Sequence, residues 1–239
     1  MSPPGPVAIL GAMPEEIQAL LEALEARSQE ISSGVVIHRG RLEGKEVVLA
    51  RSGVGKVNAA AVAQLLASAG PRALIFTGVA GAVDPSLSTG DLVVGVEALQ
   101  HDVDVTALGY ELGRVPGEAL VWKAAPDLVE IALEAAARLA ADSEEFGEVQ
   151  ILRGRVASGD QFVADTARTT HLREVFAATC VEMEGAAVAQ VCNRAGVPFV
   201  IIRSISDSAD GEAQMSFREF TELAAGRAKA LVRAMLRRL

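Results

Sequence analysis

Acidic side chains and an arginine follow apolar segments at two places in this sequence. The segment "RSISDSAD" (203–210) comes directly after the apolar run 198–202, and "VEMEGAAVAQVC" (181–192) places Glu182 and Glu184 two residues apart. Residues two apart on a strand face the same side, so we expect these two carboxylates to face together. Desolvation in a shared crevice shifts the pKa of a carboxyl group toward values useful for proton transfer. The pattern indicates a site for general acid–base chemistry.

The spacing of Glu182 and Glu184 also permits a structural interpretation. A helix is expected at 185–195, directly after Glu184, and a carboxylate at a helix N-terminus is stabilised by the helix dipole. In this alternative, one glutamate caps the helix and the other is solvated. Spacing alone does not decide between the two interpretations.

The segment "SGVGKV" (52–57) is similar to a phosphate-binding loop but misses two of its positions. That loop requires Gly-x-x-x-x-Gly-Lys-Ser/Thr, and Ala50 and Val57 stand where Gly and Ser or Thr are needed. The Gly-x-Gly-x-x-Gly fingerprint of dinucleotide binding fails as well, because Asn58 stands at its last position. We therefore interpret the segment as a tight turn between a strand and a helix.

Metal binding and covalent catalysis are weakly indicated. His38, His101 and His171 are far apart in the sequence, and "HDVDV" (101–105) is interpreted as a solvated loop with local hydrogen bonds. Neither cysteine has the sequence context of a nucleophile, and no Gly-x-Ser-x-Gly motif is present. We expect no metal and no cofactor.

Strands and helices alternate along most of the chain. The apolar patterning predicts strands at 7–11, 35–41, 46–51, 73–77, 91–99, 148–158, 179–183 and 199–206, and helices from Pro14 to Leu24 and at 56–69, 126–141, 166–176, 185–195 and 216–239. This alternation indicates an α/β fold in three layers, with helices on both faces of a mixed, mostly parallel sheet. Ligands of such sheets bind at the carboxyl ends of the strands, where the acidic segments lie.

Composition limits the kinds of partner. The chain has 239 residues, 50% of them apolar, which suits one domain (1–239) with a sizeable core. A formal net charge of −9 disfavours nucleic acids and anionic membranes as partners. No apolar run reaches the roughly 18 residues of a membrane span. The N-terminus lacks the basic region of a signal peptide and the two cysteines form no CxxC pair, so we expect a cytoplasmic protein.

A set of segments in this chain resembles one enzyme family. The segments are "GAMPEE", "SGVGKVNAA", "TGVAGA", "HDVDVTALGYELGRVPG", "SGDQF", "VEMEGAAVAQVC" and "RSISDSAD". In this order they resemble the 5′-methylthioadenosine/S-adenosylhomocysteine nucleosidases of the purine nucleoside phosphorylase/uridine phosphorylase superfamily. The resemblance implies a nucleoside phosphorylase-like fold. It also implies hydrolysis of the N-glycosidic bond of adenine nucleosides, namely 5′-methylthioadenosine, S-adenosylhomocysteine and 5′-deoxyadenosine.

The resemblance implies roles for the acidic residues. Asp207 matches the general acid that protonates the leaving adenine, and Ser206 is placed to orient its carboxyl group. Glu16 matches the general base that takes a proton from the attacking water. Glu184 matches the residue that binds the ribose hydroxyls, with Glu182 as a supporting neighbour. Glycosidases use a pair of carboxyl groups in the same way, and here the leaving group is a purine.

Other residues match positions that hold the nucleoside. Phe162 matches the aromatic that stacks on adenine, and the backbone of Val163 matches the group that reads the purine edge. Met183 matches the residue beneath the ribose, and Gly81 contributes backbone contacts. Arg203 matches a position near the glutamates, where its charge keeps them ionised.

The resemblance further implies an apolar pocket for the 5′ substituent. The lining residues are Met13, Val54 and Phe217 from one subunit, and Leu108 and Tyr110 from its neighbour. The active protein is then a homodimer in which the 102–117 segment completes the neighbour's 5′ pocket. Two departures bear on this pocket and on the water site: Leu108 replaces an aromatic residue common at the rim, and Val79 stands where the family usually has a serine that positions water or ribose.

Three alternative functions remain open from the sequence. A futalosine or aminodeoxyfutalosine nucleosidase of menaquinone biosynthesis would use the same carboxylates with a different 5′ pocket. A phosphate-dependent nucleoside phosphorylase would need cations where Glu16 stands, because a carboxylate repels phosphate. A non-catalytic nucleoside sensor would bind without turnover, and the presence of Glu16, Glu184 and Asp207 together argues against it.

Overall fold

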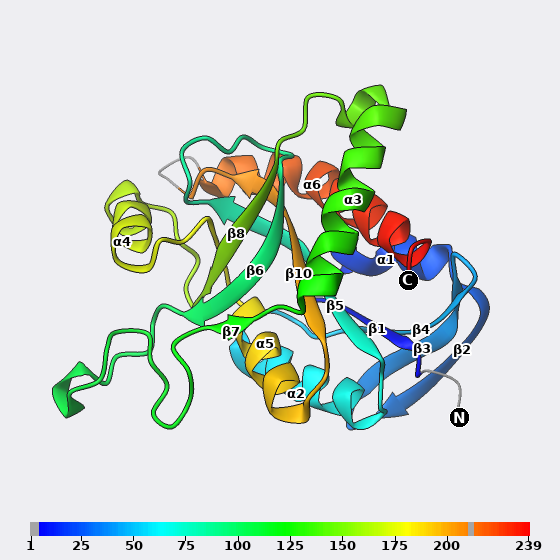
Figure 1. Ribbon diagram of the computed structural model, residues 1–239, viewed down its shortest axis with the longest axis horizontal. Coiled ribbons are helices and arrows are strands. Elements are labelled where there is room, and N and C mark those ends of the chain that lie inside the picture. The colour runs from blue at the N-terminus through cyan, green and yellow to red at the C-terminus, as the bar shows by residue number, and fades with distance from the viewer. Residues whose placement is uncertain (1–4, 210–212) are drawn as a thin grey trace.

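The structure is a computed structural model that describes residues 5–209 and 213–239, and it is built on one mixed sheet (Figure 1). Its described strands are β1 (Val7–Gly11), β2 (Glu25–Ser32), β3 (Val35–Leu42), β4 (Lys45–Arg51), β5 (Ala73–Ala82), β6 (Leu92–Gln100), β7 (Trp122–Lys123), β8 (Ile151–Ser158), β9 (Cys180–Glu182) and β10 (Phe199–Asp207). They are ordered β10-β6-β8-β9-β5-β1-β4-β3-β2, and β7 pairs with β6.

The middle of the sheet closes on itself. β10 pairs with both β6 and β5, so β10, β6, β8, β9 and β5 form a closed circuit of paired strands. Parallel pairings connect β4, β1, β5 and β10, and also β6, β8 and β9, while antiparallel pairings join these two groups. The register places Gly81 of β5 beside both Asp207 of β10 and Val181 of β9. Three strands therefore meet at one point.

Helices cover both faces of this sheet, which confirms the expected α/β architecture (Figure 1). Their bounds are α1 (Pro14–Glu22), α2 (Lys56–Ser68), α3 (Pro126–Asp142), α4 (Thr166–Phe176), α5 (Gly185–Ala195) and α6 (Ala213–Leu236). On one side α6 contacts α1 and α3, and on the other α2 contacts α5. Among the described residues, no helix is both long enough and apolar enough to pass through a bilayer.

Several element boundaries differ from the sequence-based prediction. Helix α1 ends at Glu22 rather than Leu24, and the chain then enters β2, which the apolar pattern does not indicate because its side chains are almost all exposed. Strand β5 continues five residues beyond Thr77, since the small residues of "GVAGA" stay extended and buried. Helix α6 begins at Ala213 instead of residue 216. The irregular 102–125 segment contains only the short helical turn η1 (Thr106–Leu108) and β7.

Gly226 in α6 offers a test of helix packing. A Cβ at this position would meet no atom of the described residues within 4 Å, so Gly226→Ala should remove backbone entropy from the unfolded chain without a clash. We expect the free energy of unfolding to rise by about 0.5–1 kcal/mol, measured by denaturant titration. The control is Gly154→Ala in β8, where the new Cβ would lie 2.6 Å from the Cβ of Thr179 and should destabilise. A less stable Gly226→Ala protein would contradict this packing.

Candidate active site

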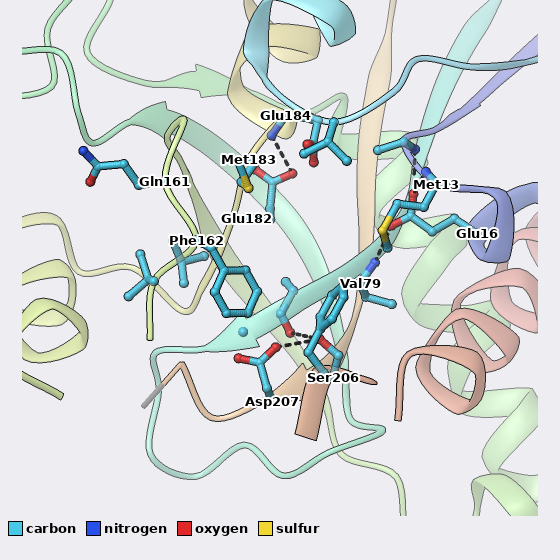
Figure 2. A pocket seen from close by; sticks show the side chains of 17 residues that line it. Met13, Glu16, Val79, Gln161, Phe162, Glu182, Met183, Glu184, Ser206 and Asp207 are labelled. Carbon is cyan, nitrogen blue, oxygen red and sulfur yellow. Dashed lines mark hydrogen bonds between the residues drawn. The ribbon is translucent and has the colours of Figure 1, made fainter. Parts of the chain in front are cut away.

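A cavity of about 280 Å³ opens where the ends of β5, β9 and β10 meet (Figure 2). Its described lining residues are Ala12, Met13, Glu16, Val54, Val79, Ala80, Gly81, Gln161, Phe162, Val163, Val181, Glu182, Met183, Glu184, Ser206, Asp207 and Phe217. These residues come from segments that are far apart in the sequence, and the closed circuit of strands brings them together. All charged side chains in this set are carboxylates.

Glu16 is held rigidly by backbone N–H groups. It is the third residue of α1, and its carboxylate turns back to accept hydrogen bonds from the N–H groups of Ala12 (2.6 Å) and Met13 (2.8 Å). The N–H of Val79, at the far end of β5, donates a third bond of 3.0 Å. Burial raises the pKa of Glu16 above its usual value, against the opposing charge of Arg203 and these hydrogen bonds. The side chain thus caps its helix and also lines the cavity.

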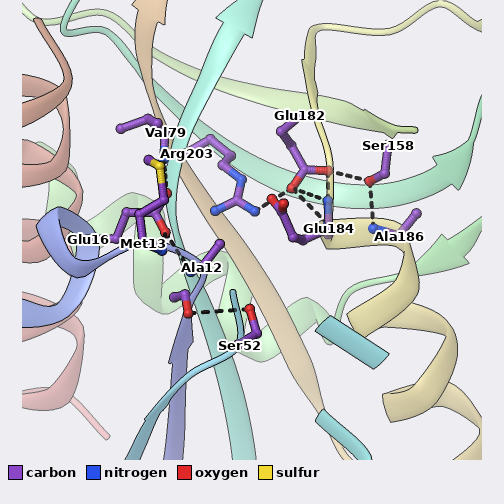
Figure 3. A network of polar contacts seen from close by, with 12 residues as sticks. Ala12, Met13, Glu16, Ser52, Val79, Ser158, Glu182, Glu184, Ala186 and Arg203 are labelled. Carbon is purple, nitrogen blue, oxygen red and sulfur yellow. Dashed lines mark hydrogen bonds and ion pairs between the residues drawn. The ribbon is translucent and has the colours of Figure 1, made fainter. Parts of the chain in front are cut away.

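Arg203 is 1% exposed and lies between Glu16 and Glu182 in the polar network, outside the cavity lining (Figure 3). Its Nη2 donates to Glu182 Oε2 at 2.5 Å, and its guanidinium lies 4.1 Å from the centre of the Phe76 ring. Burial acts to lower the pKa of Arg203, but the three neighbouring glutamates outweigh it and hold that pKa above its usual value. Arg203 does not line the cavity: it pairs with Glu182 and acts on Glu16 and Glu184 through its charge alone. The expectation that this charge keeps the glutamates ionised is wrong for Glu184, whose pKa is raised to about 8.

Glu182 and Glu184 do not share a strand face, which corrects the interpretation from their spacing. Glu182 ends β9, and its carboxylate accepts hydrogen bonds from the N–H of Gly185 at 2.9 and 2.8 Å, so Glu182 caps α5. Glu184 is the residue before α5 and accepts instead from the N–H of Gly55 at 2.8 Å. Neither side chain is solvated, since both are under a tenth exposed. Glu182 therefore caps α5 and lines the cavity at the same time.

The surroundings of Glu184 disfavour its charged form. Burial is the largest cause that raises its pKa, the charge of Glu182 raises it further, and together they bring it to about 8. The N–H of Gly55 and the charge of Arg203 oppose this shift. Glu184 is therefore poised to exchange a proton near neutral pH.

Asp207 enters the cavity from the end of β10 (Figure 2). It is 3% exposed, Ser206 Oγ donates to its Oδ2 at 2.8 Å, and the N–H of Ala209 donates to its Oδ1 at 2.9 Å. The neighbouring Ile205 is fully buried, so one side of this strand end is apolar. Asp210, at the end of the same sequence segment, lies outside the described residues.

Aromatic and aliphatic side chains form the rest of the cavity wall. The rings of Phe162 and Phe217 pack edge to face, with centroids 5.6 Å apart. Phe162 is 44% exposed, so it is a rim residue rather than a core phenylalanine. Met13 and Val54 lie on the wall contributed by α1 and the turn before α2.

Lys56 fixes the turn that carries Gly55. Its Nζ donates to Asp102 Oδ1 at 2.6 Å and to Gln100 Oε1 at 3.0 Å, and its N–H donates to Asp160 Oδ1 at 2.8 Å. The turn itself was predicted, but its anchoring was not. The interpretation of 101–105 as a solvated loop is wrong for Asp102, which is mostly buried in this ion pair.

The cavity contains all the predicted site residues except Arg203, Leu108 and Tyr110. Leu108 and Tyr110 lie in the 102–125 segment, which projects away from the sheet, and they are 74% and 40% exposed (Figure 1). Ser158 was not predicted: its Oγ contacts Glu182 and accepts from the N–H of Ala186 at 2.7 Å. Its place at the start of "SGDQF" is the one sequence signal that could have identified it.

Comparison with known proteins gives a consistent result. A profile described as the Phosphorylase superfamily matches residues 6–237. The chain is 46% identical to a 5′-methylthioadenosine/S-adenosylhomocysteine nucleosidase of Geobacillus kaustophilus, over 96% of this chain and 95% of that protein.

Solved structures agree with this result. A nucleosidase of the same name from Neisseria meningitidis, in complex with methylthio-immucillin-A, superposes with a TM-score of 0.92 at 39% identity, over 98% and 99% of the two chains. A futalosine hydrolase of Helicobacter pylori superposes with a TM-score of 0.90 at 36% identity, over 98% of each chain.

The raised pKa of Glu184 predicts a pH dependence of stability. In the unfolded chain a glutamate titrates near 4.5, whereas Glu184 in the folded protein titrates at about 8, so the folded protein binds more protons between these values. Its contribution to the free energy of unfolding is therefore present below pH 4.5 and is lost as the pH rises through 8. The stability of wild type minus that of Glu184→Gln should fall over this range, measured by urea titration at each pH. A difference that is flat or rising would contradict the raised pKa.

Removing Arg203 should strongly destabilise the protein. Arg203→Met leaves buried carboxylates without their cation, and breaking such a pair costs about 3–5 kcal/mol. The double variant Arg203→Met/Glu182→Gln removes one of the charges as well and should recover part of the loss. Denaturant unfolding of both variants tests this. Equal stability of wild type and Arg203→Met would show that the guanidinium does not compensate the glutamates.

Proposed function

Since the chain belongs to the 5′-methylthioadenosine/S-adenosylhomocysteine nucleosidases of the phosphorylase superfamily, we propose that it hydrolyses the N-glycosidic bond of these two nucleosides. The products are adenine and the 5′-thioribose, and 5′-deoxyadenosine is a further substrate. The reaction belongs to methionine salvage and S-adenosylmethionine recycling. The observation that carries the proposal is the charge of the cavity: every charged side chain among its described lining residues is a carboxylate.

Glu16 is proposed as the general base. Burial raises its pKa toward the pH at which it works, which improves a base that must accept a proton from water. Three backbone N–H groups hold the carboxylate in one orientation, so little reorganisation is needed during the reaction. Val79 has no hydroxyl with which to position water, but its N–H orients Glu16.

Asp207 is proposed as the general acid that protonates the leaving adenine. Its carboxyl group enters the cavity from β10, whereas Glu16 enters from α1, so the two groups approach the nucleoside from different walls (Figure 2). The hydroxyl of Ser206 and the N–H of Ala209 fix its orientation. Asp207 gives a proton to the purine, and Glu16 removes a proton from the attacking water on another side of the nucleoside. Together these two transfers complete the hydrolysis.

The remaining residues are proposed to hold the nucleoside between these groups. Glu184 hydrogen-bonds the ribose hydroxyls, and its ionised form favours the cationic sugar that develops in the transition state. Met183 lies beneath the ribose. Phe162 stacks on the adenine ring, the backbone of Val163 reads its edge, and Gly81 contributes backbone contacts.

Hydrolysis is favoured over phosphorolysis by electrostatics. Two unit charges of the same sign repel one another strongly in a cavity from which water is excluded, so the carboxylates disfavour phosphate as a nucleophile. The cation nearest the glutamates, Arg203, is turned toward Glu182 and does not line the cavity. Futalosine hydrolysis is the alternative, and futalosine is therefore included among the substrates to be assayed.

We also propose that the enzyme acts as a homodimer in the cytoplasm. Val54 and Val57 on one surface, and Leu108 and Tyr110 on the projecting 102–117 segment, are exposed apolar side chains that a second copy would cover. In the dimer the segment completes the neighbour's 5′ pocket. Both cysteines are free and buried, which suits a reducing compartment.

Glu16→Gln tests the proposed function. With 5′-methylthioadenosine in phosphate-free buffer, wild type should release adenine, and the variant should lose about 10²–10⁴-fold in kcat because the base is gone. Binding of methylthio-immucillin-A should persist. The matched control is Glu15→Gln, an exposed neighbour that should turn over normally. Activity that requires added phosphate, or hypoxanthine release from futalosine alone, would overturn the proposal.

A further inference from the structure

A second cavity, of about 640 Å³, adjoins the first. Its described lining residues are Ala12, Met13, Pro14, Ile17, Gln18, Leu21, Gly34, Val35, Val36, His38, Arg51, Ser52, Gly53 and Val54. Ala12, Met13 and Val54 line both cavities, so the two meet at these side chains. Of the nucleoside, the function proposed above brings only the 5′ substituent to this second space, at Met13 and Val54.

The two cavities have opposite electrostatic character. No aspartate or glutamate is among the described residues that line the second cavity, although the chain contains 31 acidic residues. Arg51, at the end of β4, supplies a positive charge and has no ion-pair partner among the described residues. Burial, aided by the charge of Arg27, lowers the pKa of His38, so this histidine is neutral at neutral pH. The space therefore favours an anion, whereas the first cavity disfavours one.

The position of the junction identifies which part of a substrate reaches the second cavity. Met13 and Val54 are the residues proposed to flank the 5′ substituent, so a long substituent that passes them enters the second cavity. The methyl group of 5′-methylthioadenosine is too short to do so. The homocysteine tail of S-adenosylhomocysteine is longer and ends in an α-amino acid group, which carries a carboxylate next to an ammonium.

We propose that the second cavity is a subsite for the carboxylate at the end of a long 5′ substituent, with Arg51 as the cation that binds it. This inference rests on the proposed function. Arg51 is then the residue by which the enzyme distinguishes S-adenosylhomocysteine from 5′-methylthioadenosine. The homocysteine carboxylate of S-adenosylhomocysteine is the expected occupant. Futalosine also carries a carboxylate on its 5′ substituent, and this carboxylate would bind Arg51 by the same charge interaction.

The test compares Arg51→Met with wild type on three nucleosides. Methionine keeps an unbranched apolar stem but removes the charge. With S-adenosylhomocysteine we expect KM to rise about tenfold, equivalent to about 1.4 kcal/mol, with kcat unchanged. With 5′-methylthioadenosine, and with 5′-butylthioadenosine, whose tail is long but uncharged, KM and kcat should stay within about twofold of wild type. Raising the salt concentration should weaken the effect, because Arg51 is exposed.

Arg41→Met is the matched control. It removes the same charge from the neighbouring strand β3, outside both cavities, and should leave all three substrates unaffected. An equal KM for S-adenosylhomocysteine in wild type and Arg51→Met, or an equal rise for all three nucleosides, would overturn the subsite. Futalosine is assayed as a fourth nucleoside. If it alone were sensitive to Arg51→Met, the subsite would be assigned to its carboxylate and the homocysteine assignment would be overturned. A wild-type protein that cleaves none of these nucleosides would overturn the proposed function itself, and the subsite with it.

Discussion

The buried guanidinium of Arg203 is the interaction on which the rest of the site depends. Burying several carboxylates in one cavity raises their pKa values, because desolvation and mutual repulsion both favour the neutral form. Arg203 opposes this shift for Glu16 and Glu184 and forms an ion pair with Glu182. It does so from outside the cavity lining, so its charge steadies the carboxylates without occupying the space of a nucleoside. The aromatic ring of Phe76 supports the cation on the other side.

The sheet is built so that these charged groups can approach one another. Strand β5 runs between the strands that carry Glu182, Arg203 and Asp207, and it has glycine at the two crowded positions. A Cβ at Gly78 would overlap the side chains of both Glu16 and Arg203, and a Cβ at Gly81 would lie 2.8 Å from Asp207 Oδ1. The two glycines of "TGVAGA" are therefore required for a steric reason.

Much of this arrangement could be predicted from the sequence, and the remainder could not for identifiable physical reasons. Periodicity located the main strands and helices, and the order of the acidic motifs located the cavity-lining carboxylates. Strand β2 was missed because an exposed edge strand carries no apolar signal. Capping of α5 was one of two open interpretations, and spacing could not assign it to Glu182. The anchoring of Lys56 to Asp102 and the N–H that Val79 gives to Glu16 were missed because tertiary contacts create them.

The most direct test of the central claim is a titration of the glutamate carboxyl groups by ¹³C NMR in the folded wild-type protein and in an Arg203→Lys variant. We predict that Glu184 titrates near pH 8 and that Glu16 titrates above its ordinary value. Both values should move upward in the variant, because an ammonium cannot reproduce the planar fork of the guanidinium. Titration of both groups at the ordinary value near 4.3, or no response to the variant, would contradict the account.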